Sequence, residues 1–83
     1  MAGMNEKRQT DLAIDTIASM VIYDLVSESG KDPETVFNEF YSSKTCETLY
    51  DESTKLWWCG PAYIVGMYKE ELEYKKNLSS YHN

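Results

Sequence analysis

Two prolines, each close behind a glycine, divide this chain into segments and constrain its fold more than any other feature. Gly30 precedes Asp32-Pro33, and Gly60 immediately precedes Pro61. Glycine favours the left-handed conformation that commonly ends a helix, whereas proline fits the first position of a new one. Proline in a helix interior would break it. We therefore predict one helix that ends before Gly30, a second that starts at Pro33, and a last one that starts at Pro61.

The segment from about Asp11 to Ser29 has the periodicity of an amphipathic helix. One stripe is apolar and consists of Ile14, Ile17, Ala18, Val21 and Leu25. The opposite face carries no charge and consists of Thr16, Ser19, Tyr23 and Ser27. A solvated helix face normally carries charged residues. We interpret this helix as central in the fold, or as covered on its far side by a partner.

Shorter elements follow. Asp32 can cap a helix that ends near Ser42 and presents two apolar pairs, Val36/Phe40 and Phe37/Tyr41. Ser43 can cap a further helix over residues 44–50, with Cys46, Leu49 and Tyr50 turned inward. Residues 51–55 are wholly polar and predict a loop, and the apolar run 56–59 predicts a short extended segment. The chain is therefore predicted to be mainly α, a compact bundle of three to four helices with a short Trp-containing extended segment before the last helix.

The last predicted helix, from Pro61 to about Lys76, carries two apolar stripes. Ile64, Val65, Tyr68 and Leu72 form the stripe expected in the core, and Tyr63, Met67 and Tyr74 form a second stripe. The second stripe suits either the core or a partner, and Gly66 would let another backbone approach closely. The 83 residues are enough for one domain, so we predict a single helical domain over 1–83 whose ends, 1–9 and 77–83, fray.

Catalytic and metal-binding patterns are missing from the sequence. The single histidine, His82, is the penultimate residue, and Cys46 and Cys59 form no CxxC pair. A zinc site needs about four ligands, and nucleophilic catalysis needs a base beside its nucleophile. We expect no enzyme activity, no catalytic residues, no metal and no cofactor.

The charge balance argues against nucleic acid and membranes as direct partners. The chain holds 14 acidic and 8 basic residues, a net charge of −6. Nucleic acid and anionic lipid are bound mainly through Lys and Arg. No apolar run approaches the roughly 20 residues that span a bilayer, and residues 1–10 lack the apolar segment of a signal peptide. We expect a cytoplasmic protein that binds another protein.

Aromatic residues are the best candidates for that contact. Trp57 and Trp58 are adjacent and flanked by Tyr50 and Tyr63. Large rings of this kind are enriched at the energetic centres of interfaces. The predicted partner-binding residues are Trp57, Trp58, Tyr50, Tyr63, Met67 and Tyr74. Both indoles could pack under the loop, or one could fill the core while the other faces solvent.

Several segments resemble a group of small bacterial helical proteins from gut-type anaerobes and mobile elements. The resemblance is carried by Ser43-Lys44-Thr45, Leu49-Tyr50-Asp51, Trp57 and Gly60-Pro61-Ala62-Tyr63-Ile64, within residues 11–74. Some members of that group resemble antitoxin-like partners encoded beside ADP-ribosyltransferase-like toxins. The Gly60-Pro61 break and the doubled Trp57-Trp58 depart from the group's pattern. The resemblance implies a binding role and carries no catalytic residue.

Three functional hypotheses follow. The first is a small acidic protein-binding module, antitoxin-like or accessory, that binds and modulates a toxin or a nucleic-acid-processing enzyme. The alternative is an inhibitor encoded by a phage or mobile element, such as an anti-CRISPR or other anti-defence protein, that blocks a nucleic-acid-binding site. Its acidic surface would consist of Asp32, Glu34, Glu39, Glu47, Asp51 and Glu52. The third is a homodimer that completes a small core.

Overall fold

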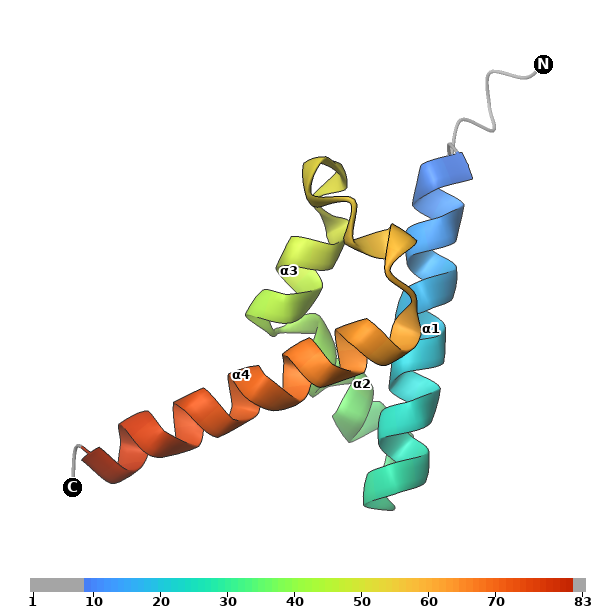
Figure 1. Ribbon diagram of the computed structural model, residues 1–83. Coiled ribbons are helices and arrows are strands. Elements are labelled where there is room, and N and C mark those ends of the chain that lie inside the picture. The colour runs from blue at the N-terminus through green and yellow to red at the C-terminus, as the bar shows by residue number, and fades with distance from the viewer. Residues whose placement is uncertain (1–8, 82–83) are drawn as a thin grey trace.

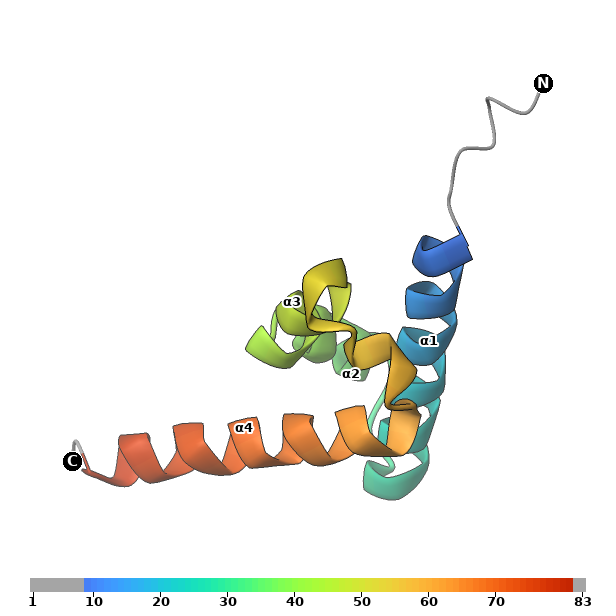
Figure 2. The same ribbon diagram turned by 45° about the horizontal axis from the view of Figure 1, so that its top comes forward.

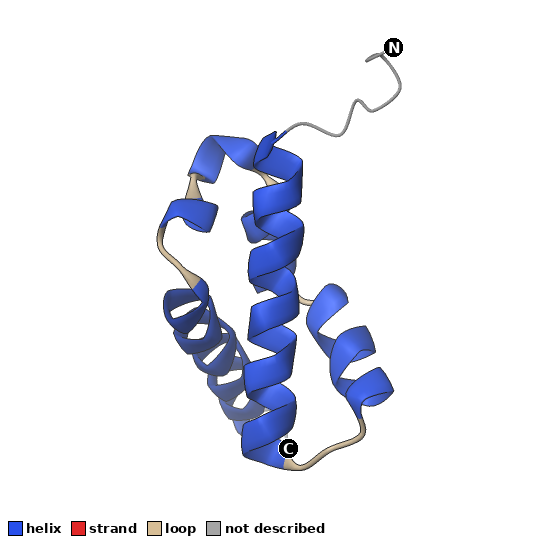
Figure 3. Cartoon of the chain, turned by 90° about the vertical axis from the view of Figure 1, so that its right-hand side faces the viewer, coloured by secondary structure: helices blue, strands red, loops and turns tan. Residues whose placement is uncertain are grey.

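The first helix begins the fold and supports the other elements. The structure is a computed structural model that describes residues 9–81, with side chains up to Leu78. Helix α1 spans Gln9–Ser29 and is followed by α2, Pro33–Tyr41, α3, Lys44–Tyr50, and α4, Pro61–Tyr81. Two single-turn 3₁₀ helices, η2 (Glu52–Thr54) and η3 (Leu56–Trp58), lie between α3 and α4. Short loops join the helices (Figure 3). The mainly α prediction is confirmed.

The predicted helix boundaries in the first half of the chain are confirmed because local caps set them. The backbone N–H of Gly30, at φ 72°, donates to the carbonyl of Val26 and ends α1. The Asp32 carboxylate accepts from the N–H of Thr35, and Pro33 occupies the first position of α2. The Ser43 hydroxyl caps α3 in the same way.

The core lies where α1, α2, α3 and the first half of α4 meet. On α1 the predicted stripe is buried at Ile14, Ala18, Val21 and Leu25, and Ile17 is half-buried beside it. Phe40 of α2 is fully buried and meets the ring of Tyr68 edge-on, with 5.3 Å between ring centroids. Leu49 of α3 and Ile64 of α4 are equally inaccessible. Each of the helices α1, α2, α3 and α4 therefore contributes at least one fully buried side chain.

One carboxylate of α4 holds the start of α3. Glu71 accepts hydrogen bonds from the backbone N–H of Lys44 at 2.9 Å and of Thr45 at 2.8 Å, and from the Thr45 hydroxyl at 2.7 Å. The first N–H groups of any helix lack partners within the helix. Because α3 has only seven residues, this contact from a distant segment satisfies a large share of its exposed donors.

The segment before α4 is helical, which makes the prediction of an extended run wrong. The N–H of Trp58 donates to the carbonyl of Lys55, and that of Cys59 donates to Leu56. These are the i to i+3 bonds of a 3₁₀ turn. Among the described residues there is no strand with which an extended segment could pair, so local bonding satisfies its backbone.

The second half of α4 leaves the bundle. The helix crosses beside α1 and α3 and then projects outward, so that its C-terminal end lies away from the other helices (Figures 1 and 2). Ile64, Val65 and Tyr68 are buried as predicted, but Leu72 is 46% exposed and every side chain from Glu73 to Leu78 is exposed. The predicted helix end near Lys76 is wrong, because α4 continues to Tyr81. Of the ends predicted to fray, 1–9 and 77–83, Gln9 and residues 77–81 are helical, and residues 1–8 and 82–83 lie outside the described residues.

Gly66 offers a direct test of how open this helix is. A Cβ added there meets no atom of the described structure within 4 Å, so none of the described residues makes the close approach that Gly66 would allow. Gly66→Ala is expected to raise the free energy of unfolding by about 0.5–1 kcal/mol, because alanine loses less backbone entropy in a helix.

The matched control is Gly60→Ala. Gly60 has φ 89°, where a side chain is strained, so this substitution should lower stability by about 1–2 kcal/mol. Urea denaturation followed by circular dichroism measures both. If Gly66→Ala destabilised the protein, the conclusion that the space around Gly66 is empty would be contradicted.

No helix within residues 9–81 combines the length and apolarity needed to cross a bilayer.

Candidate protein-binding surface

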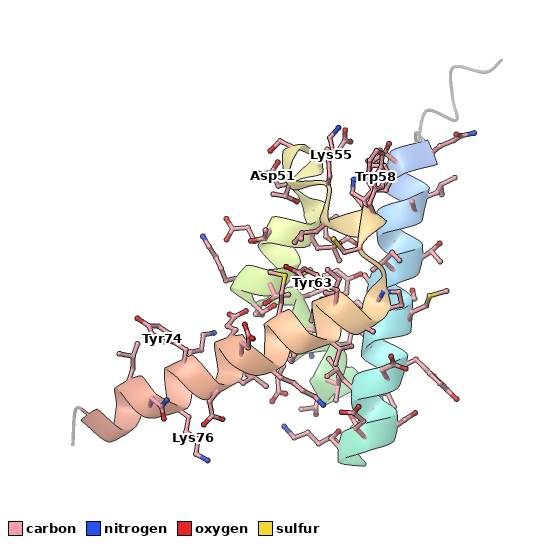
Figure 4. The ribbon with its side chains drawn as sticks, viewed as in Figure 1. Asp51, Lys55, Trp58, Tyr63, Tyr74 and Lys76 are labelled. Atoms are coloured by element: carbon pink, nitrogen blue, oxygen red, sulfur yellow. The ribbon has the colours of Figure 1, made fainter. Side chains whose placement is uncertain are left out.

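The two tryptophans have different environments. Lys55 adopts the left-handed conformation, φ 54°, and turns the chain between η2 and η3. Trp57 is half-buried against the core, while Trp58 is 68% exposed and meets the Trp57 ring edge-on. The Lys55 ammonium lies 5.3 Å from the Trp58 ring centroid (Figure 4). Of the two arrangements left open by the sequence, the structure therefore has one indole packed and one at the surface.

A larger aromatic surface lies on α1, α2 and α3. Two adjoining open grooves, of about 510 and 500 Å³, share Phe37 and Tyr41 in their linings. Tyr23 of α1 lines one groove, and Tyr50 of α3 lines the other. We call this combined surface the aromatic groove and define it by Tyr23, Phe37, Tyr41 and Tyr50. All four side chains are exposed, by 72%, 48%, 39% and 38% respectively.

The local geometry of α2 explains why these rings are accessible. Val36 and Phe40 face the core, and the i,i+4 pair Phe37 and Tyr41 stands beside them on the same helix. The Phe37 and Tyr41 rings are 4.5 Å apart. The predicted Phe37/Tyr41 pair is therefore formed. It lies beside α1, and both rings remain partly exposed to solvent.

A chain of hydrogen bonds positions the α3 side of the groove. The Tyr50 hydroxyl donates to Asp15 Oδ1 at 2.8 Å and lies 3.1 Å from the Tyr41 hydroxyl. Because the Tyr50 proton is directed to Asp15, Tyr41 is the donor to Tyr50. Burial, followed by these hydrogen bonds, raises the pKa of Tyr50 well above its ordinary value. Tyr50 therefore stays neutral and fixes the spacing between α1, α2 and α3.

The charged side chains that line the two grooves are those of Asp15 and Glu47, and Glu47 pairs with Lys44. Neither α1 nor α2 contains a lysine or arginine. Of their carboxylates, Asp15 lines the groove, whereas Glu28 pairs with Lys69 and Glu39 with Lys31. Oriented negative charge around an apolar patch favours a partner with basic residues at its edge.

Other predicted partner-binding residues do not join this surface. Tyr50 lines the aromatic groove, whereas Trp57 and Trp58 belong to η3. Tyr63 and Tyr74 lie exposed on α4, with Met67 half-buried between them. The predicted set therefore divides among three surfaces. Sequence reasoning did not assign Tyr23, Phe37 and Tyr41 to the site, although the uncharged face of α1 and the aromatic pair of α2 were their signals.

The residues of the predicted acidic surface are largely engaged in local contacts. Asp32 caps α2, and Asp51 accepts from the N–H and hydroxyl of Ser53, which lowers the pKa of Asp51. Glu39 and Glu47 pair with the ammonium groups of Lys31 at 3.3 Å and Lys44 at 3.4 Å. Glu52 is half-buried, and Glu34 is exposed in the first turn of α2. The prediction of a continuous surface of unpaired carboxylates is therefore weakened.

Comparison with known proteins gives no relative. No family model, curated protein or solved structure matches the chain. The chemistry of its surfaces therefore has to carry the functional argument.

The two cysteines differ in burial. Cys46 is buried and Cys59 is exposed, and both are free. Burial raises the pKa of the Cys46 thiol to about 11, so it stays protonated and a poor nucleophile near neutral pH. His82 lies outside the described residues.

Proposed function

We propose that this chain is a non-enzymatic, cytoplasmic protein-binding module, an antitoxin-like or accessory partner that binds and modulates another protein through the aromatic groove. The observation that carries the proposal is the gathering of four exposed rings from three helices in one surface without a cation on α1 or α2. Exposed apolar surface that continues across several elements is typical of interaction sites.

The groove suits a helical segment of the partner. An amphipathic helix can place apolar residues between α1 and α2, in the mode by which helices occupy apolar grooves. Phe37 and Tyr41 would contact its apolar face, and the carboxylates of α1 would meet basic residues at its edge. Tyrosine rings contribute large contact areas at a low entropy cost, which favours them as binding anchors.

Paired substitutions test the groove. Tyr23→Ala with Phe37→Ala should weaken partner binding at least about tenfold, because rings at the centre of an interface contribute most of its free energy. Partners would be captured from source cells on the immobilised chain, and binding would then be measured by calorimetry with the purified partner. Trp58→Ala is the matched control, since it removes an exposed ring outside the groove.

Salt separates this proposal from the alternative inhibitor. Apolar anchoring with a few charges at its edge predicts an affinity that falls only modestly as ionic strength rises, whereas an acidic surface that replaces nucleic acid predicts a steep loss. Binding that ignores the groove variant and falls steeply with salt would contradict the groove and favour the inhibitor. Full binding by the groove variant at every salt concentration would contradict both.

A further inference from the structure

The two halves of the aromatic groove differ in chemistry. The half beside α3, which we call the α3 recess, has a volume of about 510 Å³. Three rings, one thiol and two carboxylates line it: Phe37, Tyr41, Tyr50, Cys46, Asp15 and Glu47. The other half has a volume of about 500 Å³, and no charged side chain of the described residues belongs to its lining. The two halves therefore suit different side chains of an occupant.

The hydroxyl protons of the α3 recess are used within the chain. The Tyr50 hydroxyl donates to Asp15 Oδ1 at 2.8 Å, and the Tyr41 hydroxyl donates to that of Tyr50 at 3.1 Å. The hydroxyl oxygens and the two carboxylates can then offer an occupant only lone pairs, and the buried Cys46 thiol is at most a weak donor. This polar lining favours a ligand that donates hydrogen bonds and carries positive charge.

The rings of the α3 recess add an attraction for a cation. The centroid of the Tyr41 ring lies 4.5 Å from that of Phe37 and 6.0 Å from that of Tyr50, with angles of 35° and 47° between the ring planes. All three rings are partly exposed, so an occupant can reach them. Organic cations are attracted to the faces of such rings. The rings and the carboxylates therefore favour the same class of ligand.

The cations of the chain itself leave the α3 recess open. Among the described residues, no lysine or arginine belongs to its lining. Lys44 pairs with Glu47 at 3.4 Å, but the two side chains are 75% and 73% exposed. Such pairs contribute little to stability because water screens them. Glu47 can therefore exchange Lys44 for a cation that also contacts the rings.

We propose that the α3 recess binds an arginine side chain of the partner, while the uncharged half of the groove holds an apolar residue of the same segment. This inference rests on the proposed function and names the side chain that the groove selects. A guanidinium group is planar and weakly hydrated, and it donates several hydrogen bonds but accepts none. It can lie against a ring while its N–H groups reach Glu47 or Asp15. The ammonium group of lysine is compact and strongly hydrated, so it gains less from the rings.

Three small amides test this preference on the wild-type chain without the partner. N-acetyl-arginine amide carries the guanidinium, N-acetyl-lysine amide has the same charge, and N-acetyl-citrulline amide has nearly the same shape without charge. Each is titrated into protein with isotope-labelled tyrosine, and the ring signals are followed by NMR. The arginine amide should shift the signals of Tyr41 and Tyr50 saturably and bind at least about threefold more tightly than the lysine amide, and the citrulline amide should not bind. Tyr63 and Tyr74, exposed on α4, are the internal controls whose signals should not move.

Two pairs of variants separate the ring from the charge. Tyr41→Leu should weaken binding of the arginine amide at least about fivefold, whereas Tyr41→Phe keeps a ring and should bind within about twofold of wild type. Glu47→Gln should weaken it at least about twofold, whereas Glu73→Gln makes the same change in net charge on an exposed part of α4 and should have no effect. Circular dichroism checks the fold of each variant. The comparison of the three amides needs only the wild-type chain, so a variant that fails to fold leaves the test decisive.

Several results would overturn the inference. One is equal binding of the arginine and lysine amides, and another is tighter binding of tetramethylammonium, which would make the recess a site for quaternary ammonium compounds. If the arginine amide leaves Tyr41 and Tyr50 unshifted while Tyr23→Ala with Phe37→Ala still loses the partner, this inference falls and the proposed function stands. Saturable binding of the arginine amide together with a partner that ignores this groove variant contradicts the proposed function, and with it the partner's arginine as the occupant.

Discussion

Phe40→Ala is expected to lower the free energy of unfolding by about 3–5 kcal/mol, the largest loss from any single substitution considered for this chain. The Phe40 side chain is fully buried and packs edge-on against both Tyr68 and Tyr41. Its removal forfeits burial and leaves a cavity that neighbouring side chains fill only in part. Small domains have about 5–15 kcal/mol of stability in total, so this loss would remove a large share of it.

Urea denaturation followed by circular dichroism measures this effect, and Phe37→Ala is its control. Phe37 is the same residue type on the same helix, one turn earlier, but 48% exposed. Its substitution should cost about 1 kcal/mol. Similar losses for Phe37→Ala and Phe40→Ala would contradict the assignment of one ring to the core and the other to the aromatic groove.

Glu71→Gln is expected to cost about 2–3 kcal/mol near neutral pH, because the carboxylate accepts three hydrogen bonds from the start of α3 and pairs with the Lys75 ammonium at 3.2 Å. Burial alone would raise the pKa of Glu71, but the hydrogen bonds from Thr45 and Lys44, with that from Lys75, lower it to about 2. The charged form is therefore the one that the folded state prefers.

The pH dependence has a definite sign. A pKa that falls from 4.5 in the unfolded chain to about 2 in the fold adds stability that is fully present above pH 4.5. This contribution is lost as the pH falls from 4.5 toward 2. The difference in stability between wild type and Glu71→Gln, measured by urea denaturation, should shrink over that range. Glu73→Gln, an exposed carboxylate on the same helix, should show little difference at any pH.

Local signals account for the parts of the fold that the sequence predicts correctly. Asp32 with Pro33 and Ser43 define the starts of α2 and α3, because a cap acts within three residues of its own position. The buried stripe of α1 is predicted by the spacing of three to four residues between its apolar side chains. The 3₁₀ turn at Trp57 could not be predicted, because an apolar run of four residues is compatible with several backbone conformations.

In the candidate site, too, contacts between neighbours in the sequence could be predicted, whereas contacts between distant segments could not. The pairing of Phe37 with Tyr41 is visible in their i,i+4 spacing, but their exposure depends on how α2 lies against α1. The contact of Glu71 with Thr45 joins residues 26 positions apart, and no pattern in the sequence connects them. The length of α4 was underestimated because its second half lacks the buried residues by which a helix is recognised.

Helix α3 is held at both ends by contacts from other elements. Glu71 binds its first turn, and Tyr50 at its last residue bonds to Asp15. A seven-residue helix does not persist alone, so loss of either contact would destabilise the whole of α3. The position of the Tyr50 ring therefore depends on contacts made by α4 and α1 as well as on α3 itself.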